Sequence, residues 1–314
     1  MSQYSGGKFI VTDVEDEEEE AARRRIPFAD PTPTRGAHSR GPLSNVSRIA
    51  IYGLLILFAA WYLTPIYILL VTSFKGTSAI TLDQMWVPPT SFDLSSFQEA
   101  WAKLAPNFIN SLSLAIPAAI ISSIIGSING YVLSKWKFRG SEVIFTLILF
   151  GMFIPYQSIL IPLTQVMTNI GLYGSIPGLI MVHCIYGIPI TTLIFRNYYA
   201  GIPTELLEAA KVDGAGFFRV YRSIMLPLSA SGFVVVLIWQ FNSVWNDFLF
   251  AVTLIPNQST WPMTVALNNL SGSFIASYNV QMAGALLAAL PTLVIFVVLG
   301  RYFVRGLLAG SLKG

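Results

Sequence analysis

About six stretches of this chain are long, apolar and nearly free of charge, at about 49–74, 108–134, 142–167, 178–198, 230–255 and 280–302. Each is close to the roughly 20 residues that an α-helix needs to cross a bilayer. Only 11% of the residues are charged, whereas a soluble domain carries roughly 25%. The pattern predicts an all-α integral membrane protein with about six transmembrane helices.

Prolines and glycines lie inside several of these stretches and would argue against helices in water. In a membrane, neighbouring helices can satisfy the backbone groups that a proline frees, and small residues let helices approach closely. We therefore expect kinked, closely packed helices. The residues concerned are Pro117, Pro155, Pro162, Pro189, Pro291, Gly126, Gly130, Gly151 and Gly187.

The segment 203–228 is one of the few charged stretches between the apolar ones. Thr204 is expected to start a short helix, with its hydroxyl capping free N–H groups. Gly214 is expected to end that helix in the left-handed conformation, and a second short helix should follow until Pro227 stops it. The two alanines at 209–210 have short side chains, so another protein could approach the surface of this helix closely.

The spacing within this segment resembles a known family motif. Glu208-Ala209-Ala210, Asp213-Gly214-Ala215, Ile224 and Leu226-Pro227 match the EAA loop of the permease subunits of binding-protein-dependent ABC importers. The resemblance implies a type I ABC importer transmembrane domain whose loop couples to a partner ATPase. The residues to which it assigns this coupling role are Glu208, Ala209, Ala210, Asp213, Gly214, Ala215, Ile224 and Pro227.

The chain departs from the family pattern at one point of this motif. The family commonly has a second proline about four residues after the first, and here Ser231 stands before Gly232. This departure weakens the expectation of the family's local kink but does not affect the expected docking helix.

Two further segments narrow the resemblance, which covers roughly residues 46–314. Residues 245–251, Trp-Asn-Asp-Phe-Leu-Phe-Ala, are similar to the segment after the EAA loop in the carbohydrate class of these permeases. Residues 301–314 are similar to the tail of the shorter permease of the maltose-type pair. The resemblance implies a sugar, oligosaccharide or polyol as cargo. It also implies a second ATPase contact at Gly310, Ser311, Lys313 and Gly314, for which a frayed terminus is the alternative.

The fifth apolar stretch carries amide and aromatic side chains. Polar residues inside a membrane tend to face a cavity or the interior of the helix bundle, and aromatic faces with amide groups are suited to binding sugars. The candidate translocation residues are Gln240, Asn242, Trp245 and Asn246. The alternative is that each of these residues only holds helices together by hydrogen bonds.

The basic residues predict the orientation of the chain. After residue 48, all of them except Lys75 and Lys103 fall in the segments 135–139, 196–222 and 301–313. Cytosolic loops retain Lys and Arg, so both termini and the EAA loop should be cytosolic in a cell membrane protein.

Four regions follow from this topology. They are a disordered cytosolic tail at 1–48, rich in charge, Pro and Gly; a first transmembrane helix with an external loop at 49–107; a transmembrane core at 108–302 with the EAA loop at 203–228; and a cytosolic tail at 303–314. The outer loop 75–106 resembles the loop that helps to receive the binding protein in sugar permeases. The charge-free loop 256–279 suits a neutral hydroxylated ligand or a polar partner, or is an ordinary loop.

The chemistry of ATP hydrolysis is expected in partner subunits. The chain has no G-x-x-x-x-G-K-[ST] phosphate-binding motif, so ATP and Mg²⁺ would be bound by the partners. His38, His183 and Cys184 are too few for a His- or Cys-based metal site. The expected partners are a second homologous permease, two ATP-binding subunits, an external solute-binding protein and the lipid bilayer, with no nucleic acid.

Several other functions stay open on the sequence alone. A secondary carrier would work without an ATPase, but it usually has internal repeats or coupled acidic residues inside the membrane, and this sequence shows neither. A membrane scaffold or receptor would leave uptake intact when lost. Within the ABC importers, a permease for a polyamine, phosphate or an amino acid is the nearer alternative.

Overall fold

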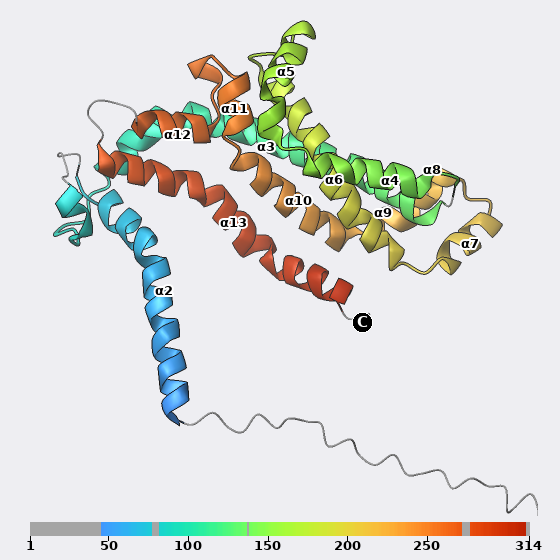
Figure 1. The fold of residues 1–314 in the computed structure, drawn as a ribbon, viewed down its shortest axis with the longest axis horizontal. Helices are drawn as coiled ribbons and strands as arrows, with labels where there is room; N and C mark the ends of the chain where they lie inside the picture. The colour runs from blue at the N-terminus through green and yellow to red at the C-terminus, as the bar shows by residue number, and fades with distance from the viewer. Residues whose placement is uncertain (1–44, 77–81, 137, 272–276, 312–314) are drawn as a thin grey trace, which may run out of the picture. The chain divides into compact units, whose positions relative to one another are not determined.

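The computed structural model describes residues 45–76, 82–136, 138–271 and 277–311 (Figure 1). Most of the described residues are helical, and none of them forms a strand. The chain divides into two units, 1–61 and 62–314, each described by itself. The first unit contributes the beginning of helix α2 (Asn45–Ser73). Of the predicted disordered tail 1–48, residues 1–44 lie outside the described residues, and the last four begin α2.

The second unit contains the end of α2 and all later helices. These are α3 (Ser95–Lys135), α4 (Ser141–Phe150), α5 (Tyr156–Asn169), α6 (Ile176–Ala200), α7 (Glu205–Val212), α8 (Phe217–Val220), α9 (Leu226–Leu228), α10 (Ala230–Trp245), α11 (Leu249–Leu254), α12 (Met263–Ser271) and α13 (Tyr278–Ser311). Short 3₁₀ turns lie at Leu82–Trp86, Gly151–Phe153 and Gln258–Thr260, and a π-helical turn, η3, at Tyr221–Met225.

Four of the described helices are long and apolar enough to cross a membrane, at Ser47–Ser73, Ser95–Lys135, Ile176–Ala200 and Tyr278–Gly300. Two bent pairs raise the number to as many as six if each pair is one span. The prediction of an all-α chain with about six apolar spans is confirmed.

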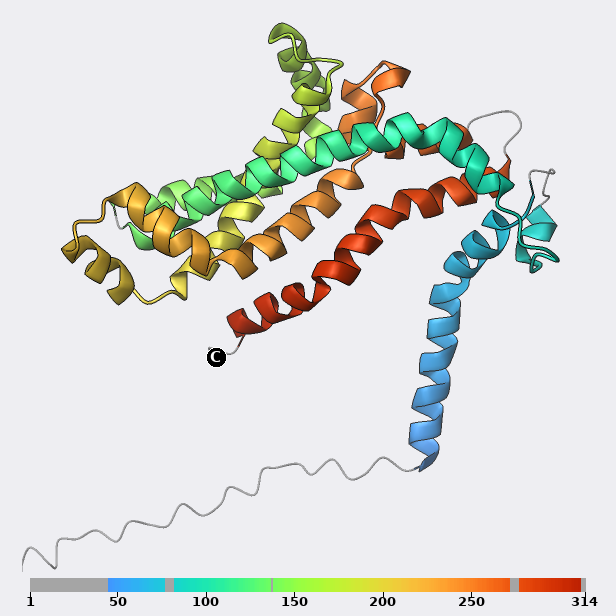
Figure 2. The same cartoon turned by 180° about the vertical axis from the view of Figure 1, so that it is seen from behind.

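Helices α3 and α6 form the centre of the second unit and pack along each other, with α10 beside them (Figure 2). Their close approach depends on glycine. A Cβ atom on Gly126 would lie 2.2 Å from the hydroxyl of Thr191, and one on Gly130 would lie 2.7 Å from the backbone nitrogen of Arg196. Thr191 also donates a hydrogen bond to the carbonyl of Ser122, at 3.1 Å. The expected close packing at these two glycines is confirmed.

The span predicted at 142–167 is not one straight helix. It consists of α4 and α5, which meet at an angle of 98°. The break lies at Ile154 and Pro155, which are both extended. The proline ring disfavours a helical conformation of the residue before it, so the helix ends here instead of merely kinking.

The span predicted at 230–255 is also wrong in its second half. Helix α10 ends at Trp245, and the short helix α11 begins after a break. Asp247 lies in the break and accepts hydrogen bonds from the backbone nitrogens of Phe250, at 3.4 Å, and Ala251, at 3.1 Å. A side chain that satisfies the free N–H groups of a new helix favours a new start over continuation.

Three expected non-helical segments turn out to be partly helical. The external loop expected up to residue 107 contains the first turns of α3, the loop expected at 256–279 contains α12, and the tail expected at 303–314 is helical through Ser311. At the N-terminal ends of α3 and α13, the buried Asn279 donates a hydrogen bond to Ser96 at 2.9 Å. This contact ties the start of α13 to the start of α3.

Candidate functional site

The EAA loop, residues 203–228, lies at one end of the second unit, where α7 projects beyond the ends of α6 and α9 (Figures 1 and 2). Helix α7 begins after Thr204, as predicted, but its expected cap is wrong. Thr204 has a helical backbone conformation, and its side chain makes no capping hydrogen bond. A capping residue normally has extended backbone angles that bring its oxygen over the free N–H groups.

Gly214 ends α7 in the left-handed conformation, with φ at +74°, as predicted. The nitrogen of Ala215 donates to the carbonyl of Ala210 at 2.9 Å, and the nitrogen of Gly214 donates to that of Lys211 at 3.0 Å. These two bonds are those of a Schellman motif. Because residues with a Cβ atom disfavour this conformation, the turn between the two short helices depends on glycine.

The two faces of α7 differ. Leu207 and Ala210 are buried against Tyr131, Tyr199 and Val220. The expectation that both alanines form the surface is therefore wrong for Ala210. Other side chains of the loop remain exposed, among them Glu208, Ala209, Asp213 and Pro227 and the large apolar Leu206, Val212 and Phe218.

Aromatic side chains connect the loop to α3. The ring of Phe217 lies 5.0 Å from that of Tyr131 and 5.4 Å from that of Trp136. The ammonium group of Lys211 lies 4.8 Å from the centre of the Trp136 ring, a cation–π geometry. A displacement of α7 or α8 would therefore act directly on the end of α3.

The second helix of the loop is continuous through α8, η3 and α9 and ends at Leu228, one residue after Pro227. Ile224 lies within η3 and packs against the same core as Leu207. Because Pro227 has no N–H group and its ring crowds the carbonyl four residues earlier, it disturbs the helix at Ser223, inside the π-helical turn.

A bend of 76° separates this helix from α10. It is present although the second family proline is missing. Ser229 stands at the bend, and its hydroxyl donates to the carbonyl of Leu226 and lies 3.0 Å from the Tyr199 hydroxyl. Tyr198 donates to the carbonyl of Leu228 at 3.0 Å and lies 2.8 Å from the Ser231 hydroxyl. Serine and tyrosine hydroxyls thus hold the bend.

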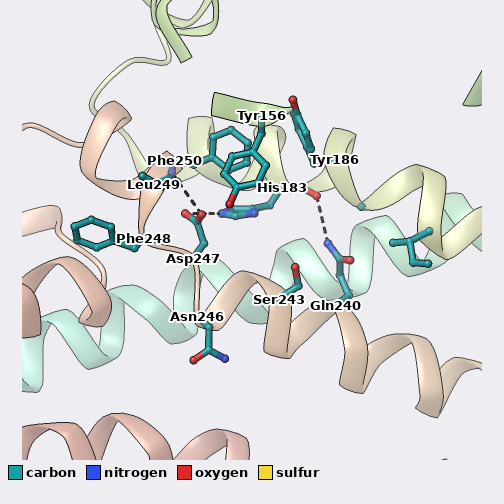
Figure 3. Close-up of a pocket in the computed structure, with 12 residues that line it drawn as sticks. Tyr156, His183, Tyr186, Gln240, Ser243, Asn246, Asp247, Phe248, Leu249 and Phe250 are labelled. Carbon is teal, nitrogen blue, oxygen red and sulfur yellow. Dashed lines mark hydrogen bonds and ion pairs between the residues drawn. The ribbon is translucent and has the colours of Figure 1, made fainter. Parts of the chain in front are cut away.

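A cavity of about 480 Å³ lies between α5, α6, α10 and α11 (Figure 3). Its aromatic side is centred on Phe250, whose ring lies 5.5 Å from Tyr156, 5.0 Å from Tyr186 and 5.6 Å from His183. The break between α10 and α11 brings Phe250 there. The lining residues are Tyr156, His183, Tyr186, Gly187, Ile190, Gln240, Ser243, Asn246, Asp247, Phe248, Leu249 and Phe250.

A histidine and an aspartate lie side by side in this lining. The Nε2 atom of His183 is 3.5 Å from a carboxylate oxygen of Asp247, and only 6% and 12% of the two side chains are exposed. The same nitrogen is buried and makes no hydrogen bond within the described residues. The contact is therefore an ion pair when the imidazole is protonated, without the short geometry of a hydrogen bond.

The structure separates the four predicted translocation residues. Gln240 and Asn246 line the cavity, whereas Asn242 and Trp245 do not. The amide of Gln240 donates to the carbonyl of His183 at 3.3 Å. Asn246 turns away from His183 and Asp247 (Figure 3) and donates to the carbonyl of Asn242 at 2.8 Å.

Two of these side chains hold helices together. Trp245 is buried, donates to the carbonyl of Ala288 on α13 at 2.9 Å, and stacks on Phe241. Gln240 packs so closely on α6 that a Cβ atom on Gly187 would lie 2.4 Å from its amide nitrogen. Gln240 thus both lines the cavity and joins two helices.

Sequence reasoning missed most of the cavity. From the sequence, His183 was considered only as a metal ligand and Asp247 only as part of the segment 245–251. The signal that could have found them is that ionisable residues within membrane spans are rare and usually functional. The contribution of Tyr156 and Phe250 depends on the two helix breaks, which the apolar pattern did not show.

The predicted C-terminal contact is described only in part. Gly310 and Ser311 belong to α13 by their backbone, and Lys313 and Gly314 lie outside the described residues. Within the described parts of the chain, no group of three or more His, Cys, Asp or Glu side chains could hold a metal ion.

Comparison with known proteins finds one family across the core of the chain. A family model described as "Binding-protein-dependent transport system inner membrane component" matches residues 122–308. A probable ABC transporter permease protein of Pyrococcus horikoshii is 49% identical over 85% of this chain and 98% of the relative. The xylose/arabinose import permease protein XacI of Haloferax volcanii is 34% identical over 84% of this chain and 93% of the relative.

The fold has a counterpart among solved structures. A bacterial ABC transporter involved in the import of the acidic polysaccharide alginate contains a chain that matches with a TM-score of 0.71 and 22% identity. The match covers 82% of this chain and 96% of that chain. The family suggested by the EAA loop is thus confirmed, and this protein belongs to the inner membrane components of binding-protein-dependent transport systems, the permeases of ABC transporters.

Proposed function

We propose that this chain is the permease subunit of an ABC importer for a saccharide or related polyol. The observation that carries the proposal is the construction of the EAA loop. Helix α7 presents Glu208 and Ala209 outward, while its other face is part of the core of α3, α6 and α10. A partner that pulls on the exposed face therefore moves the membrane helices.

The proposed partner on this face is an ATP-binding subunit. Val212 and Phe218 are 88% and 79% exposed, and Leu206 is 45% exposed. Such apolar side chains next to the carboxylates of Glu208 and Asp213 suit a protein surface with a hydrophobic pocket and a polar rim. Gly310, Ser311, Lys313 and Gly314 supply a second contact to the same partners.

The complete importer contains a second homologous permease, two ATP-binding subunits and an external solute-binding protein. ATP and Mg²⁺ are bound and ATP is hydrolysed by the partners, and this chain performs no catalysis. The distribution of Lys and Arg supports a cytosolic position of both termini and of the EAA loop in a cell membrane protein.

The proposed cargo class rests on relatives and on the cavity. A relative named for xylose/arabinose import and one named for glucose import, each 34% identical, are permeases of this type. The cavity combines aromatic rings with an amide, a hydroxyl and a carboxylate, which are the groups that bind sugar C–H faces and hydroxyls.

Co-purification from mild detergent, with mass spectrometry of the bound proteins, tests the proposal. An ATP-binding subunit, a second permease and a solute-binding protein are expected. Val212→Glu should lose the ATP-binding subunit, because it places a charge in the docking face. Leu94→Glu, a matched change at an exposed apolar residue of the predicted outer region, should retain it. Retention by both variants, or recovery of the chain alone, would contradict the proposal.

A further inference from the structure

We infer that the pair His183–Asp247 makes the cavity between α5, α6, α10 and α11 selective for uncharged saccharides and against uronic acids. This inference rests on the proposed function and adds a property of the cargo. It concerns the charge of the sugar at this site, which the permease family does not determine.

The charges of the cavity come from one pair. His183 and Asp247 lie 3.5 Å apart and are both largely buried. None of the described residues that line the cavity is Lys or Arg. The pair has no net charge when the imidazole is protonated and a charge of −1 when it is neutral. In neither state does the cavity have a surplus positive charge.

A carboxylate on the cargo therefore finds no counter-ion here. Burying an anion without a positive partner is costly, and Asp247 would add direct repulsion. His183 cannot compensate the charge of both carboxylates, because it already lies beside Asp247. A uronic acid would thus be disfavoured by desolvation and by like charge.

A neutral sugar meets suitable groups at the same place. The Asp247 carboxylate accepts hydrogen bonds from two backbone N–H groups at the start of α11. These bonds hold the carboxylate in place, and its remaining acceptor positions are available to sugar hydroxyls. Hydroxyls donate especially well to an ionised acceptor. The buried Nε2 of His183 has no hydrogen-bond partner in the described chain, so a sugar hydroxyl could supply one. Phe250 and its aromatic neighbours offer faces for the C–H groups.

The size of the cavity fits this use. Its volume of about 480 Å³ lies within the range of roughly 300–1,000 Å³ that is usual for ligand sites. Its residues come from four helices and from the break between α10 and α11. A relative movement of these helices would therefore change the site.

Binding of matched sugars to the purified permease complex in nanodiscs tests the inference. The probes are glucose with glucuronate and galactose with galacturonate, since each pair differs only at C6, where a hydroxymethyl group is replaced by a carboxylate. Saturation-transfer NMR titrations give the dissociation constants. We expect each neutral sugar to bind at least about tenfold more tightly than its uronate, a difference that corresponds to roughly 1.4 kcal/mol.

Removing the charge of Asp247 should narrow this difference. Asp247→Asn and Asp247→Ser both keep an oxygen that can accept from Ala251 at the start of α11, so the local fold has support in each variant. Glu99→Gln is the matched control, because Glu99 is a partly exposed acid paired with Lys103 outside the cavity. It should leave the ratio of the two constants unchanged.

Three results would overturn the inference. They are equal binding of uronate and neutral sugar to the unaltered protein, an unchanged ratio in both Asp247 variants, and no binding of any of the four probes. None of them decides whether an ATP-binding subunit co-purifies. The failure of this inference is therefore distinguishable from a failure of the proposed function.

Discussion

The hydroxyl of Ser127 on α3 lies 2.6 Å from the hydroxyl of Tyr199 on α6, and both side chains are fully buried. Ser127 also lies 2.9 Å from the hydroxyl of Tyr221, in the π-helical turn of the EAA loop. Tyr199 in turn contacts Ser229 at the bend before α10. This chain of hydroxyls connects the proposed docking loop to three membrane helices, so it should contribute to both stability and coupling.

Replacing Ser127 with Ala should destabilise the protein, because two tyrosine hydroxyls lose a buried partner. The expected cost is about 1–3 kcal/mol. Thermal unfolding in detergent, followed by tryptophan fluorescence, measures it. Ser123→Ala is the control, since Ser123 is a fully buried serine on the same helix whose hydroxyl has no hydrogen-bond partner in the described structure. Equal losses in the two variants would contradict a role for the network.

Replacing Gly214 with Val should impair coupling without preventing membrane insertion. The positive φ of Gly214 is strained for a β-branched residue, at a cost of about 1–2 kcal/mol, and open space around it leaves backbone conformation as the cause. Gly216 also has open space but has φ at −75°. The ratio of cargo transported to ATP hydrolysed should fall in Gly214→Val and not in Gly216→Val.

Gly214→Asn provides a further check of this explanation. Asparagine enters the left-handed region more readily than other non-glycine residues, so this variant should retain more coupling than Gly214→Val. Equal coupling in Gly214→Val and the unaltered protein would show that the turn is not needed.

Replacing Gly130 with Ala should disturb the packing of α3 on α6. The added Cβ atom would meet the backbone of Arg196 at 2.7 Å, and backbone cannot move aside as a flexible side chain can. Overpacking of this kind costs about 1–3 kcal/mol. Gly300→Ala adds the same methyl group where nothing lies within 4 Å. The midpoint of thermal unfolding should fall only for Gly130→Ala.

The sequence predicted those parts of the fold that depend on local chemistry. Gly214 was identified because the left-handed end of a helix favours glycine, and the close packing at Gly126 and Gly130 because small residues permit it. The breaks at Pro155 and Asp247 were missed. Proline inside a membrane helix is compatible with either a kink or an end, and the choice depends on tertiary contacts. Half of the cavity lining followed from these breaks, so it was not predictable from apolar length alone.

The placement of polar side chains was predicted less well than the loop. Trp245 and Gln240 look alike in the sequence, because both carry a polar group within the same apolar stretch. Trp245 is turned to α13, and Gln240 to α6 and the cavity. The direction depends on which face of α10 meets which neighbour, and sequence spacing does not contain that information.

The orientation proposed from basic residues can be tested by labelling introduced cysteines in whole cells. Lys211→Cys should react only after the membrane is permeabilised, whereas Lys103→Cys should react from outside. Both positions are exposed, and the native Cys184 is buried and should stay unlabelled. Reaction of Lys211→Cys with a membrane-impermeant reagent in intact cells would reverse the topology.

Saccharide uptake by the co-purified complex in proteoliposomes tests directly whether transport is driven through the EAA loop. Labelled sugar should accumulate only with the solute-binding protein outside the membrane and ATP on the side of the EAA loop. Val212→Glu should abolish this uptake. Uptake that proceeds without ATP, or that persists in Val212→Glu, would contradict a permease driven through this loop.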